Sequence, residues 1–399
     1  MALLALPARA AAGDPNILIF LTDDQRLDYT MAMMPTARHY FGDGGTRFSR
    51  AYVTTPLCCP SRASIFSGRY AHNTGVTTND GGAGFDARDT WEHYLHNHGY
   101  YTGLIGKYLN GVPTETAPYF DYTDEATNYG PGEVAAITAS ASTFFDRAAN
   151  RDQPWALEIA AYSPHDPWDN YPTDPLPIPP YSPLPSYLEA DRSDKSPYVQ
   201  SRWPTDAAVA TSYQGQMREV QAADEELGNV IQIIRGHRLG GNLLSFFLSD
   251  NGYLWGEHGL MAKRWPYRES VQVPFYMRWP GHVGAGAVDN RLVANIDIAP
   301  TIFEATSITP GYTVDGRSLV GGTARKWLLL EWPAAGYLNM PLWRSYVDAE
   351  RQYIKWGDGW REFYDLRTDP WEMEASNSDR PFLDAVLSSA ATCAGASCP

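Results

Sequence analysis

Two short, continuous apolar runs constrain the fold of this chain more than any other feature. Asn16–Thr22 is followed directly by Asp23 and Asp24, and Leu243–Ser249 is followed in the same way by Asp250 and Asn251. Uninterrupted apolar runs of this length are typical of parallel strands buried on both faces. Ligands of open α/β sheets bind at the carboxyl ends of such strands. The sequence therefore predicts two parallel strands whose terminal acidic pairs share one site.

Helical patterns lie between and around these runs. Apolar residues recur at helical spacing over residues 213–234, which predicts an amphipathic helix leading into the second strand. Residues 91–99 predict a helix stopped by glycine, residues 100–106 a strand, and residues 155–161 a further strand. Alternating strands and helices predict a doubly wound α/β fold with a mixed, mostly parallel sheet flanked by helices.

Two segments depart from this alternation. Residues 164–204 are rich in proline, which excludes a helix or a central strand, and we interpret them as a rim over a substrate. Beyond residue 319, short aromatic runs at 326–332, 343–347, 352–356 and 361–366 predict a small antiparallel sheet. We therefore expect a catalytic domain over residues 14–322 and a C-terminal antiparallel subdomain over residues 323–399.

Charge and cysteine content narrow the classes of function. A net charge of −15 argues against a nucleic-acid partner, but a few basic residues or a metal can still attract an anionic substrate. Cys393 and Cys398 enclose a short loop that a disulfide could close, a redox or metal pair being the alternative. A disulfide would indicate an oxidising compartment. Residues 1–13 resemble the end of a secretory signal, which predicts a secreted, periplasmic or extracellular protein. No apolar run reaches the roughly 18–20 residues of a membrane span.

The segment Cys58-Cys59-Pro60-Ser61-Arg62 carries the most specific functional signal. Taken alone, it is compatible with a pair of buried thiols, the common state of free cysteine. The pattern C-x-P-S-R, however, resembles the signature of the sulfatases, members of the alkaline-phosphatase-like superfamily. The resemblance implies that a formylglycine-generating enzyme oxidises Cys58, and not Cys59, to formylglycine. The hydrated aldehyde would then be the nucleophile.

The resemblance extends in order along nearly the whole chain. Its elements are Asp23-Asp24, Cys58 to Arg62, Lys107, His165, Asp250-Asn251, Lys263 and the closing segment 364–370. Asp23, Asp24, Asp250 and Asn251 form an all-oxygen set that suits Ca²⁺ or Mg²⁺ better than zinc. Either pair alone would more often form a turn. The resemblance favours Ca²⁺ and places the modified Cys58 among the metal ligands.

The resemblance also implies roles for the cationic side chains. Arg62 lies one helical turn after Cys58, where it could reach the modified side chain. Lys107 would stand near the metal and the nucleophile. Lys263 and His165 would hold the sulfate, and one of them would protonate the leaving oxygen. For His258, close to Lys263 in sequence, a rim or structural role is expected.

One departure from the common family pattern narrows the resemblance to a branch. Many sulfatases have Gly-Lys-Trp-His where this chain has Gly106-Lys107-Tyr108-Leu109-Asn110, so the usual histidine contact is missing. This form, together with the Cys-Cys-Pro-Ser-Arg segment and the following His72-Asn73, resembles the N-acetylglucosamine-6-sulfatase branch.

The sequence therefore predicts a sulfuric ester hydrolase acting on a sulfated glycan such as 6-sulfated N-acetylglucosamine. Three alternatives remain open at this point. They are an arylsulfatase, a phosphodiesterase or phosphonate monoester hydrolase of the same superfamily, and an unmodified carbohydrate-binding relative without catalysis.

Overall fold

A computed structural model describes residues 13–126, 131–321 and 323–399. All but the last residue of the predicted signal remnant at 1–13 lies outside these ranges. The domain boundary expected at 322/323 adjoins residue 322, also outside them, and stays a prediction.

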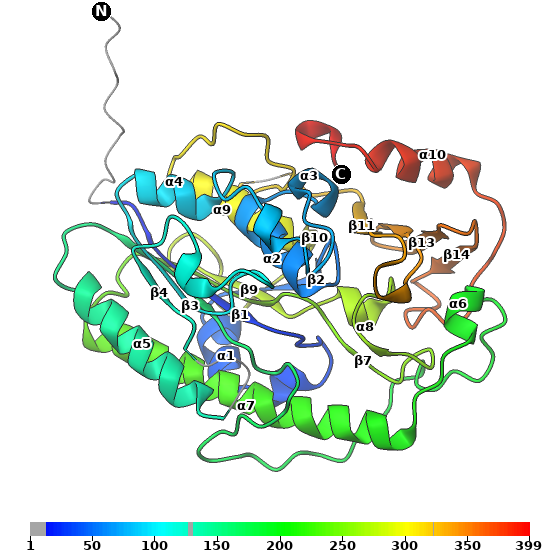
Figure 1. The fold of residues 1–399 in the computed structure, drawn as a ribbon, viewed down its shortest axis with the longest axis horizontal. Coiled ribbons are helices and arrows are strands. Elements are labelled where there is room, and N and C mark those ends of the chain that lie inside the picture. The colour runs from blue at the N-terminus through cyan, green and yellow to red at the C-terminus, as the bar shows by residue number, and fades with distance from the viewer. Residues whose placement is uncertain (1–12, 127–130, 322) are drawn as a thin grey trace, which may run out of the picture.

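An eight-stranded sheet forms the centre of the molecule (Figure 1). Its strands run in the order β10-β2-β9-β6-β1-β5-β3-β4, and only β9 runs antiparallel to its neighbours. The mixed, mostly parallel sheet predicted from the sequence is thereby confirmed. In chain order its strands are β1 (Asn16–Thr22), β2 (Thr46–Tyr52), β3 (Tyr101–Gly106), β4 (Tyr122–Asp124), β5 (Trp155–Ala160), β6 (Leu243–Ser249), β9 (Phe275–Arg278) and β10 (Ala287–Ala294).

Helices cover both faces of this sheet (Figure 1). One face carries α2 (Cys58–Ser67), α4 (Trp91–Asn97) and α9 (Ile298–Ala305), and the other carries α1 (Pro35–Ala37), α5 (Glu133–Ala148) and α7 (Asp206–Gly236). The shorter or peripheral elements are α3 (Ala71–Thr74), α6 (Pro197–Gln200), β7 (Leu254–Trp255), β8 (Met261–Ala262), α8 (Arg268–Val271) and α10 (Pro381–Ala390).

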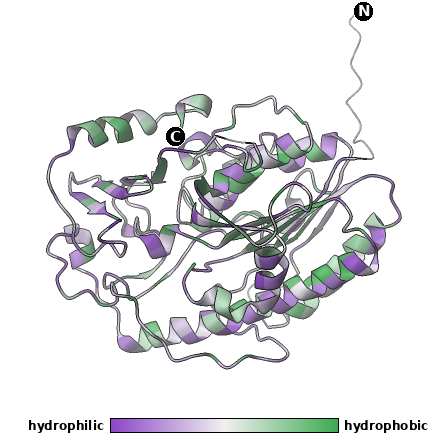
Figure 2. Cartoon of the chain, turned by 180° about the vertical axis from the view of Figure 1, so that it is seen from behind, coloured by the Kyte–Doolittle hydropathy of each residue, from purple (hydrophilic) through white to green (hydrophobic). Residues whose placement is uncertain are grey.

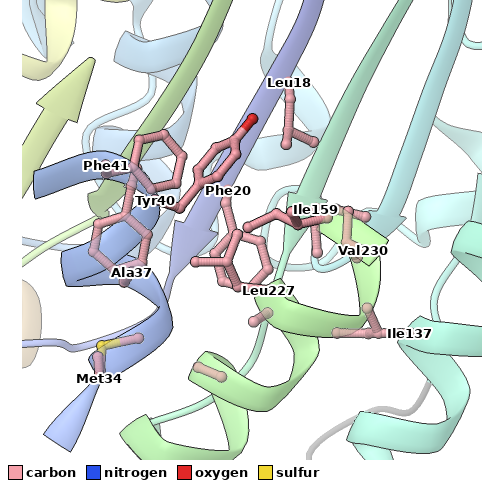
Figure 3. Packing of buried hydrophobic residues seen from close by; sticks show 14 of the residues in the cluster. Leu18, Phe20, Met34, Ala37, Tyr40, Phe41, Ile137, Ile159, Leu227 and Val230 are labelled. Carbon is pink, nitrogen blue, oxygen red and sulfur yellow. The ribbon is translucent and has the colours of Figure 1, made fainter. Parts of the chain in front are cut away.

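Strand β1 shows why a continuous apolar run is needed at the centre of the sheet. Leu18 and Phe20 point to the face of α5 and α7, where they join a cluster that includes Leu227 of α7 (Figure 3). Ile17 and Ile19, which alternate with them, pack on the opposite face with α2, α4 and α9. Successive side chains of a strand point to opposite faces, so both sets must be apolar.

Helix α7 is the amphipathic helix expected from residues 213–234, and it is longer than predicted. Its apolar side chains, such as Leu227 and Val230, are buried against the sheet. Figure 2 shows hydrophobic and hydrophilic residues alternating along α5 and α7, as a helix with one buried face requires.

The C-terminal region forms the separate antiparallel sheet that the aromatic runs predict. Its strands are β11 (Leu328–Trp332), β12 (Trp343–Val347), β13 (Arg351–Trp356) and β14 (Arg361–Asp365), paired in that order. A third apolar cluster joins this sheet to α8 and the segments around it. Cys393 and Cys398 form a disulfide. No helix in the described ranges is both long and apolar enough to cross a membrane.

Residues 164–204 contain one short helix, α6, and otherwise run as a loop along α7, where Leu176 N donates to Gln221 Oε1 (2.6 Å). Tyr187 forms a single bridge with Glu257 near the end of the loop. The prediction that proline excludes a helix from this segment is wrong at α6, where Pro197 takes the first helical position, at which no N–H partner is needed. No strand of the central sheet lies in the segment, and its role as a substrate rim stays a prediction.

One buried carboxyl of the sheet leads to a prediction on stability. Glu158 on β5 is fully buried, neither oxygen has a hydrogen-bond partner among the described residues, and burial raises its pKa from 4.5 to about 8 against the opposing effect of Arg62. The folded protein then holds one proton more than the unfolded chain between these pH values. Stability should therefore fall as pH rises across this window, by about 1.4 kcal/mol per pH unit for this one group.

The variant Glu158→Gln should lack this contribution, because its side chain does not titrate. Urea unfolding at pH 5, 6, 7 and 8 measures the difference in free energy of unfolding between the variant and the parent. We expect that difference to grow in favour of the variant with rising pH. A constant difference would contradict the raised pKa.

Candidate active site at the strand ends

The two acidic pairs lie side by side because their strands are neighbours. Parallel pairing of β1 with β6 places Thr22 opposite Ser249, so the residues that follow each strand meet at one edge of the sheet. Asp24 N donates to Asp250 Oδ1 (3.2 Å), and Asn251 Nδ2 donates to Asp24 Oδ1 (2.6 Å). The shared site predicted from the two apolar runs is therefore present as a geometric cluster.

Neighbouring elements add the basic side chains. Lys107 directly follows β3, and His165 lies five residues beyond β5, at the same edge of the sheet. Cys58 and Arg62 come from the first turns of α2, and Lys263 follows β8. The structure thus brings together every predicted site residue: Asp23, Asp24, Cys58, Arg62, Lys107, His165, Asp250, Asn251 and Lys263.

Cys58 faces the centre of this cluster. Its Sγ lies 3.4 Å from Asp23 Oδ1 and accepts a contact from Lys263 Nζ at 2.8 Å. Cys59 is also buried, but its Sγ lies near Gly82, away from these groups. The two adjacent thiols therefore have different surroundings, and only Cys58 contacts the charged residues.

Three basic side chains are paired with the three carboxylates. Arg62 Nε donates to Asp250 Oδ2 (2.9 Å), and its Nη2 lies 3.4 Å from Asp23 Oδ2. Lys107 and Lys263 form short ion pairs with Asp23 and Asp24. Arg62 Nη1 also donates a hydrogen bond to the backbone carbonyl of Lys107 (2.8 Å). Arg62 therefore holds the backbone at Lys107 in place as well as the two carboxylates.

Burial and neighbouring charges together raise the pKa values of Asp250 and Cys58 and lower the pKa of Asp23. Burial raises the pKa of the Asp250 carboxyl to about 6, and the carboxylate of Asp23 acts in the same direction. For Asp23 burial also favours the neutral form, but Lys107, His165 and Arg62 together hold its pKa well below 3.8. Burial, with the added effect of Asp23, raises the pKa of the Cys58 thiol, which is therefore protonated at neutral pH.

The oxygen atoms of the cluster fit a hard divalent cation. Asp23, Asp24, Cys58 and His165 each offer a ligand atom, all within 4.8 Å of one another. The Oδ1 of Asn251 is buried, and no described residue donates a hydrogen bond to it. A buried amide oxygen without a hydrogen-bond donor is costly unless a cation or a water molecule binds it. Carboxylate and amide oxygens are the ligands that Ca²⁺ and Mg²⁺ prefer.

His165 is the most exposed member of the site, with 20% of its side chain accessible. Its Nε2 lies 3.7 Å from Asp24 Oδ2, and its Nδ1 lies 2.5 Å from the carbonyl oxygen of Asp166. The partly exposed ring can therefore meet a ligand that enters from solvent.

One residue that holds the His165 loop in place was not predicted from the sequence. Glu133, in the first turn of α5, accepts hydrogen bonds from Tyr162 N (2.5 Å) and Ser163 Oγ (2.8 Å). Asn170 Nδ2 also donates to it (3.0 Å). Its only sequence signal is an acidic residue in the first turn of a helix, which is common for electrostatic reasons alone.

Replacing Glu133 with alanine should displace this loop, because the buried Tyr162 N–H loses its acceptor. We expect the catalytic efficiency kcat/KM to fall on the order of 10- to 100-fold, the usual effect of misplacing a group near the reacting centre. Glu133→Gln keeps one carbonyl oxygen and should restore part of the loss. Steady-state kinetics of both variants test this, and unchanged kinetics for Glu133→Ala would contradict it.

Two of the residues that suggested a particular branch, His72 and Asn73, lie outside this cluster. His72 Nδ1 lies 2.8 Å from Glu331 Oε1, and Asn73 Nδ2 donates to Asp315 Oδ2 (2.8 Å). Both side chains also contact the carbonyl of Cys393. They tie α3 to the C-terminal region, so their role here is structural. Leu109 and Asn110 instead line a cavity that begins at Lys107.

Fold and site together define an α/β protein that holds three carboxylates, a cysteine and several basic groups at the ends of its central strands. The family model named Sulfatase matches residues 15–308, so the chain belongs to the sulfatase family.

Curated relatives agree with this assignment, and a solved structure shares the fold. The chain is 30% identical to the extracellular sulfatase SULF-1 homolog of Drosophila melanogaster, over 77% of this chain and 31% of that protein. It is 27% identical to human N-acetylglucosamine-6-sulfatase, over 77% of this chain and 64% of the relative. A structure solved with its substrate D-glucosamine-2-N,6-O-disulfate superposes with a TM-score of 0.77 at 20% identity, covering 94% of this chain and 96% of that one. The chain spans less than a third of the length of the first of these curated relatives and less than two thirds of the second.

Proposed function

We propose that this protein hydrolyses sulfate esters, with formylglycine formed from Cys58 as its nucleophilic residue. The observation that carries the proposal is the placement of Cys58, which begins the buried helix α2 and contacts both Lys263 and Asp23. Helix N-termini stabilise negative charge, and the neighbouring lysines add to that effect. Oxidised to the hydrated aldehyde, this position would supply a hydroxyl nucleophile and a second hydroxyl that allows release of sulfate.

The basic residues would neutralise the sulfate and the leaving oxygen. Lys107 and Lys263 each pair with an aspartate of the cluster, Lys107 with Asp23 and Lys263 with Asp24. They would bind the sulfate oxygens, while Arg62 holds Asp250 and Asp23 in position. Stabilising charge that develops in the transition state is the largest usual source of rate enhancement. His165, partly exposed and beside Asp24, or Lys263 would donate the proton to the leaving oxygen.

A divalent cation would be held by Asp23, Asp24, Asp250 and Asn251, together with the side chain at position 58. The oxygens of Asp23, Asp24, Asp250 and Asn251, joined at Asp24 by hydrogen bonds, and the Asn251 Oδ1 that has no partner among the described residues support Ca²⁺, with Mg²⁺ as the alternative. When bound, such a cation supplies positive charge for the sulfate and the nucleophile. These five side chains would orient the bound cation.

A sulfated glycan is the substrate class that we propose, with 6-sulfated N-acetylglucosamine as the first candidate. A cavity of about 410 Å³ begins at Lys107 and includes Asn110, Glu125 and Tyr162. Tyr162 Oη donates to Glu125 Oε1 (3.0 Å), so amide, carboxylate and phenol groups are available to sugar hydroxyls. The names of the relatives support the same class. With the disulfide Cys393–Cys398, they also support an extracellular or periplasmic location.

Two measurements test the proposed function. Mass spectrometry of the peptide spanning residues 51–62, from protein matured in its native host, should find an aldehyde at position 58. The same protein should hydrolyse N-acetylglucosamine 6-sulfate faster than an aryl sulfate, a phosphate diester or a phosphonate monoester. Two intact thiols combined with no turnover of any sulfate ester would overturn the proposal, and faster turnover of the phosphonate would indicate the alternative hydrolase.

A further inference from the structure

A second group of metal-ligand side chains lies outside the strand-end site, in the interior between α8 and the C-terminal sheet. His258, Glu269 and Glu372 each offer one ligand atom, and these atoms lie within 4.8 Å of one another. All three side chains are at least 98% buried. They come from the segment between β7 and β8, from α8, and from the segment after β14, so the tertiary fold alone assembles them.

The histidine of this group is oriented by a fourth buried residue. His258 Nδ1 lies 2.8 Å from Glu189 Oε2, and Glu189 is itself buried. A carboxylate bound to one ring nitrogen holds the proton there and leaves the other nitrogen with a free lone pair. This carboxylate–histidine arrangement is the one usually found behind a metal-bound histidine.

The remaining atoms have no partner that explains their burial. No described residue forms a hydrogen bond with His258 Nε2 or with Glu269 Oε2. With the proton on Nδ1, the lone pair of Nε2 faces two carboxyl groups, which is unfavourable. With both nitrogens protonated, the Nε2–H is a buried donor without an acceptor within bonding distance, which costs about 1–3 kcal/mol. A cation between the imidazole and the two carboxylates removes both problems.

Neighbouring basic groups are already engaged by other carboxylates. Arg268 forms a two-bond ion pair with Asp28 (2.9 and 3.0 Å) and lies only within 3.9 Å of Glu269. Arg26 pairs with Glu257 at 3.0 Å. Apart from the imidazole of His258, Glu269 and Glu372 therefore have no close cation among the described residues, although the backbone N–H of Arg268 donates to Glu372 Oε2 (3.0 Å).

The backbone at His258 is consistent with a constrained functional position. Its φ of 53° lies in the left-handed region, which is unfavourable for a residue with a side chain. Two hydrogen bonds hold it there, from His258 N to the carbonyl of Ser186 (2.7 Å) and from Arg192 Nη1 to the carbonyl of His258 (3.0 Å).

We propose that His258, Glu269 and Glu372 bind a structural transition-metal cation of the zinc class, with Glu189 orienting His258. One imidazole and two carboxylates form a donor set for zinc, which binds such ligands at about 2.0–2.2 Å. A cavity of about 450 Å³ lined by Glu372 and Arg268 offers the entry path. The bound metal would fasten the segment after β14 to the segment that carries Lys263, five residues beyond His258.

The experiment uses the full chain, stripped of metal and then saturated with Ca²⁺ so that the strand-end site is filled. Zinc alone is added, the protein is separated by gel filtration, and zinc per chain is counted by plasma mass spectrometry. We expect one zinc per chain and a rise in Tm of about 5 °C at zinc concentrations far above Kd. With Co²⁺ in place of zinc, an absorption band of low-coordinate cobalt should appear.

Variants assign the metal to its site. Glu372→Gln and His258→Gln should each lose zinc, the rise in Tm and the cobalt band, whereas His282→Gln, at an exposed histidine, should keep all three. Asp250→Asn, altered in the strand-end site, should also keep them. If His258→Gln or Glu372→Gln fails to fold, zinc retained by both the parent and Asp250→Asn still supports the proposal.

Three results would overturn it. They are no zinc on the parent chain, zinc retained by folded His258→Gln and Glu372→Gln, and zinc lost from Asp250→Asn. None of these readouts depends on sulfatase activity, so the outcome is independent of the proposed function.

Discussion

Cys58→Ala is expected to abolish hydrolysis of sulfate esters while leaving the fold intact. Removal of a catalytic nucleophile typically lowers kcat on the order of 10⁴- to 10⁶-fold. Cys58 is the only thiol that contacts Lys263 and Asp23, and alanine at this position fits the buried helix start. Steady-state kinetics and thermal unfolding, measured on the same preparation, separate loss of chemistry from loss of fold.

The adjacent cysteine provides the matched control. Cys59 has the same exposure but lies against Gly82, so Cys59→Ala should leave a small cavity and cost about 1–2 kcal/mol of stability. Its kcat should stay within a few-fold of the parent. The opposite pattern, with Cys59→Ala inactive and Cys58→Ala active, would show that the nucleophile is assigned to the wrong residue.

Asp250→Ala should lose the divalent cation and the activity together. The variant removes one carboxylate ligand and leaves the buried guanidinium of Arg62 with the longer contact to Asp23 as its remaining ion pair among the described residues. We expect a fall in kcat/KM on the order of 10³-fold. The loss of stability should reach about 3–5 kcal/mol, the usual effect of removing one partner of a buried ion pair. Calcium per chain, activity and unfolding free energy are the three measurements.

A second buried aspartate separates stability from metal binding. Asp297 is fully buried and pairs with Arg325 away from the strand-end site. Asp297→Ala should therefore cost a similar amount of stability while it keeps the calcium. Calcium retained at full occupancy by Asp250→Ala, or lost equally from Asp297→Ala, would argue against the proposed ligand set.

Patterns within short segments of the sequence predicted the strands whose burial on both faces requires an apolar run. β1 and β6 were predictable because a strand covered on both faces must be apolar along its whole length. β2 was not predicted, because Arg47 and Arg50 interrupt its pattern. β9 was not predicted either, and its antiparallel direction depends on how α8 and the preceding turns return the chain to the sheet.

The site residues that directly follow strands were also predictable from the sequence. Asp23, Asp250 and Lys107 directly follow strands, and the carboxyl ends of parallel strands meet at one edge. Glu133, in contrast, gives no distinctive sequence signal, because it acts through contacts with Tyr162 and Ser163, some 30 residues away.

The sequence by itself determined the fold class, the family and the residues gathered at the strand ends, because apolar runs and a contiguous motif are properties of neighbouring positions. Only the tertiary structure decided that Cys58 and not Cys59 faces the carboxylates, and that His72 and Asn73 are structural. It also brought Glu189, His258, Glu269 and Glu372 together from four separate segments. The physical reason is that burial, pairing and unsatisfied hydrogen bonds depend on distances in space, which the order of residues along the chain does not specify.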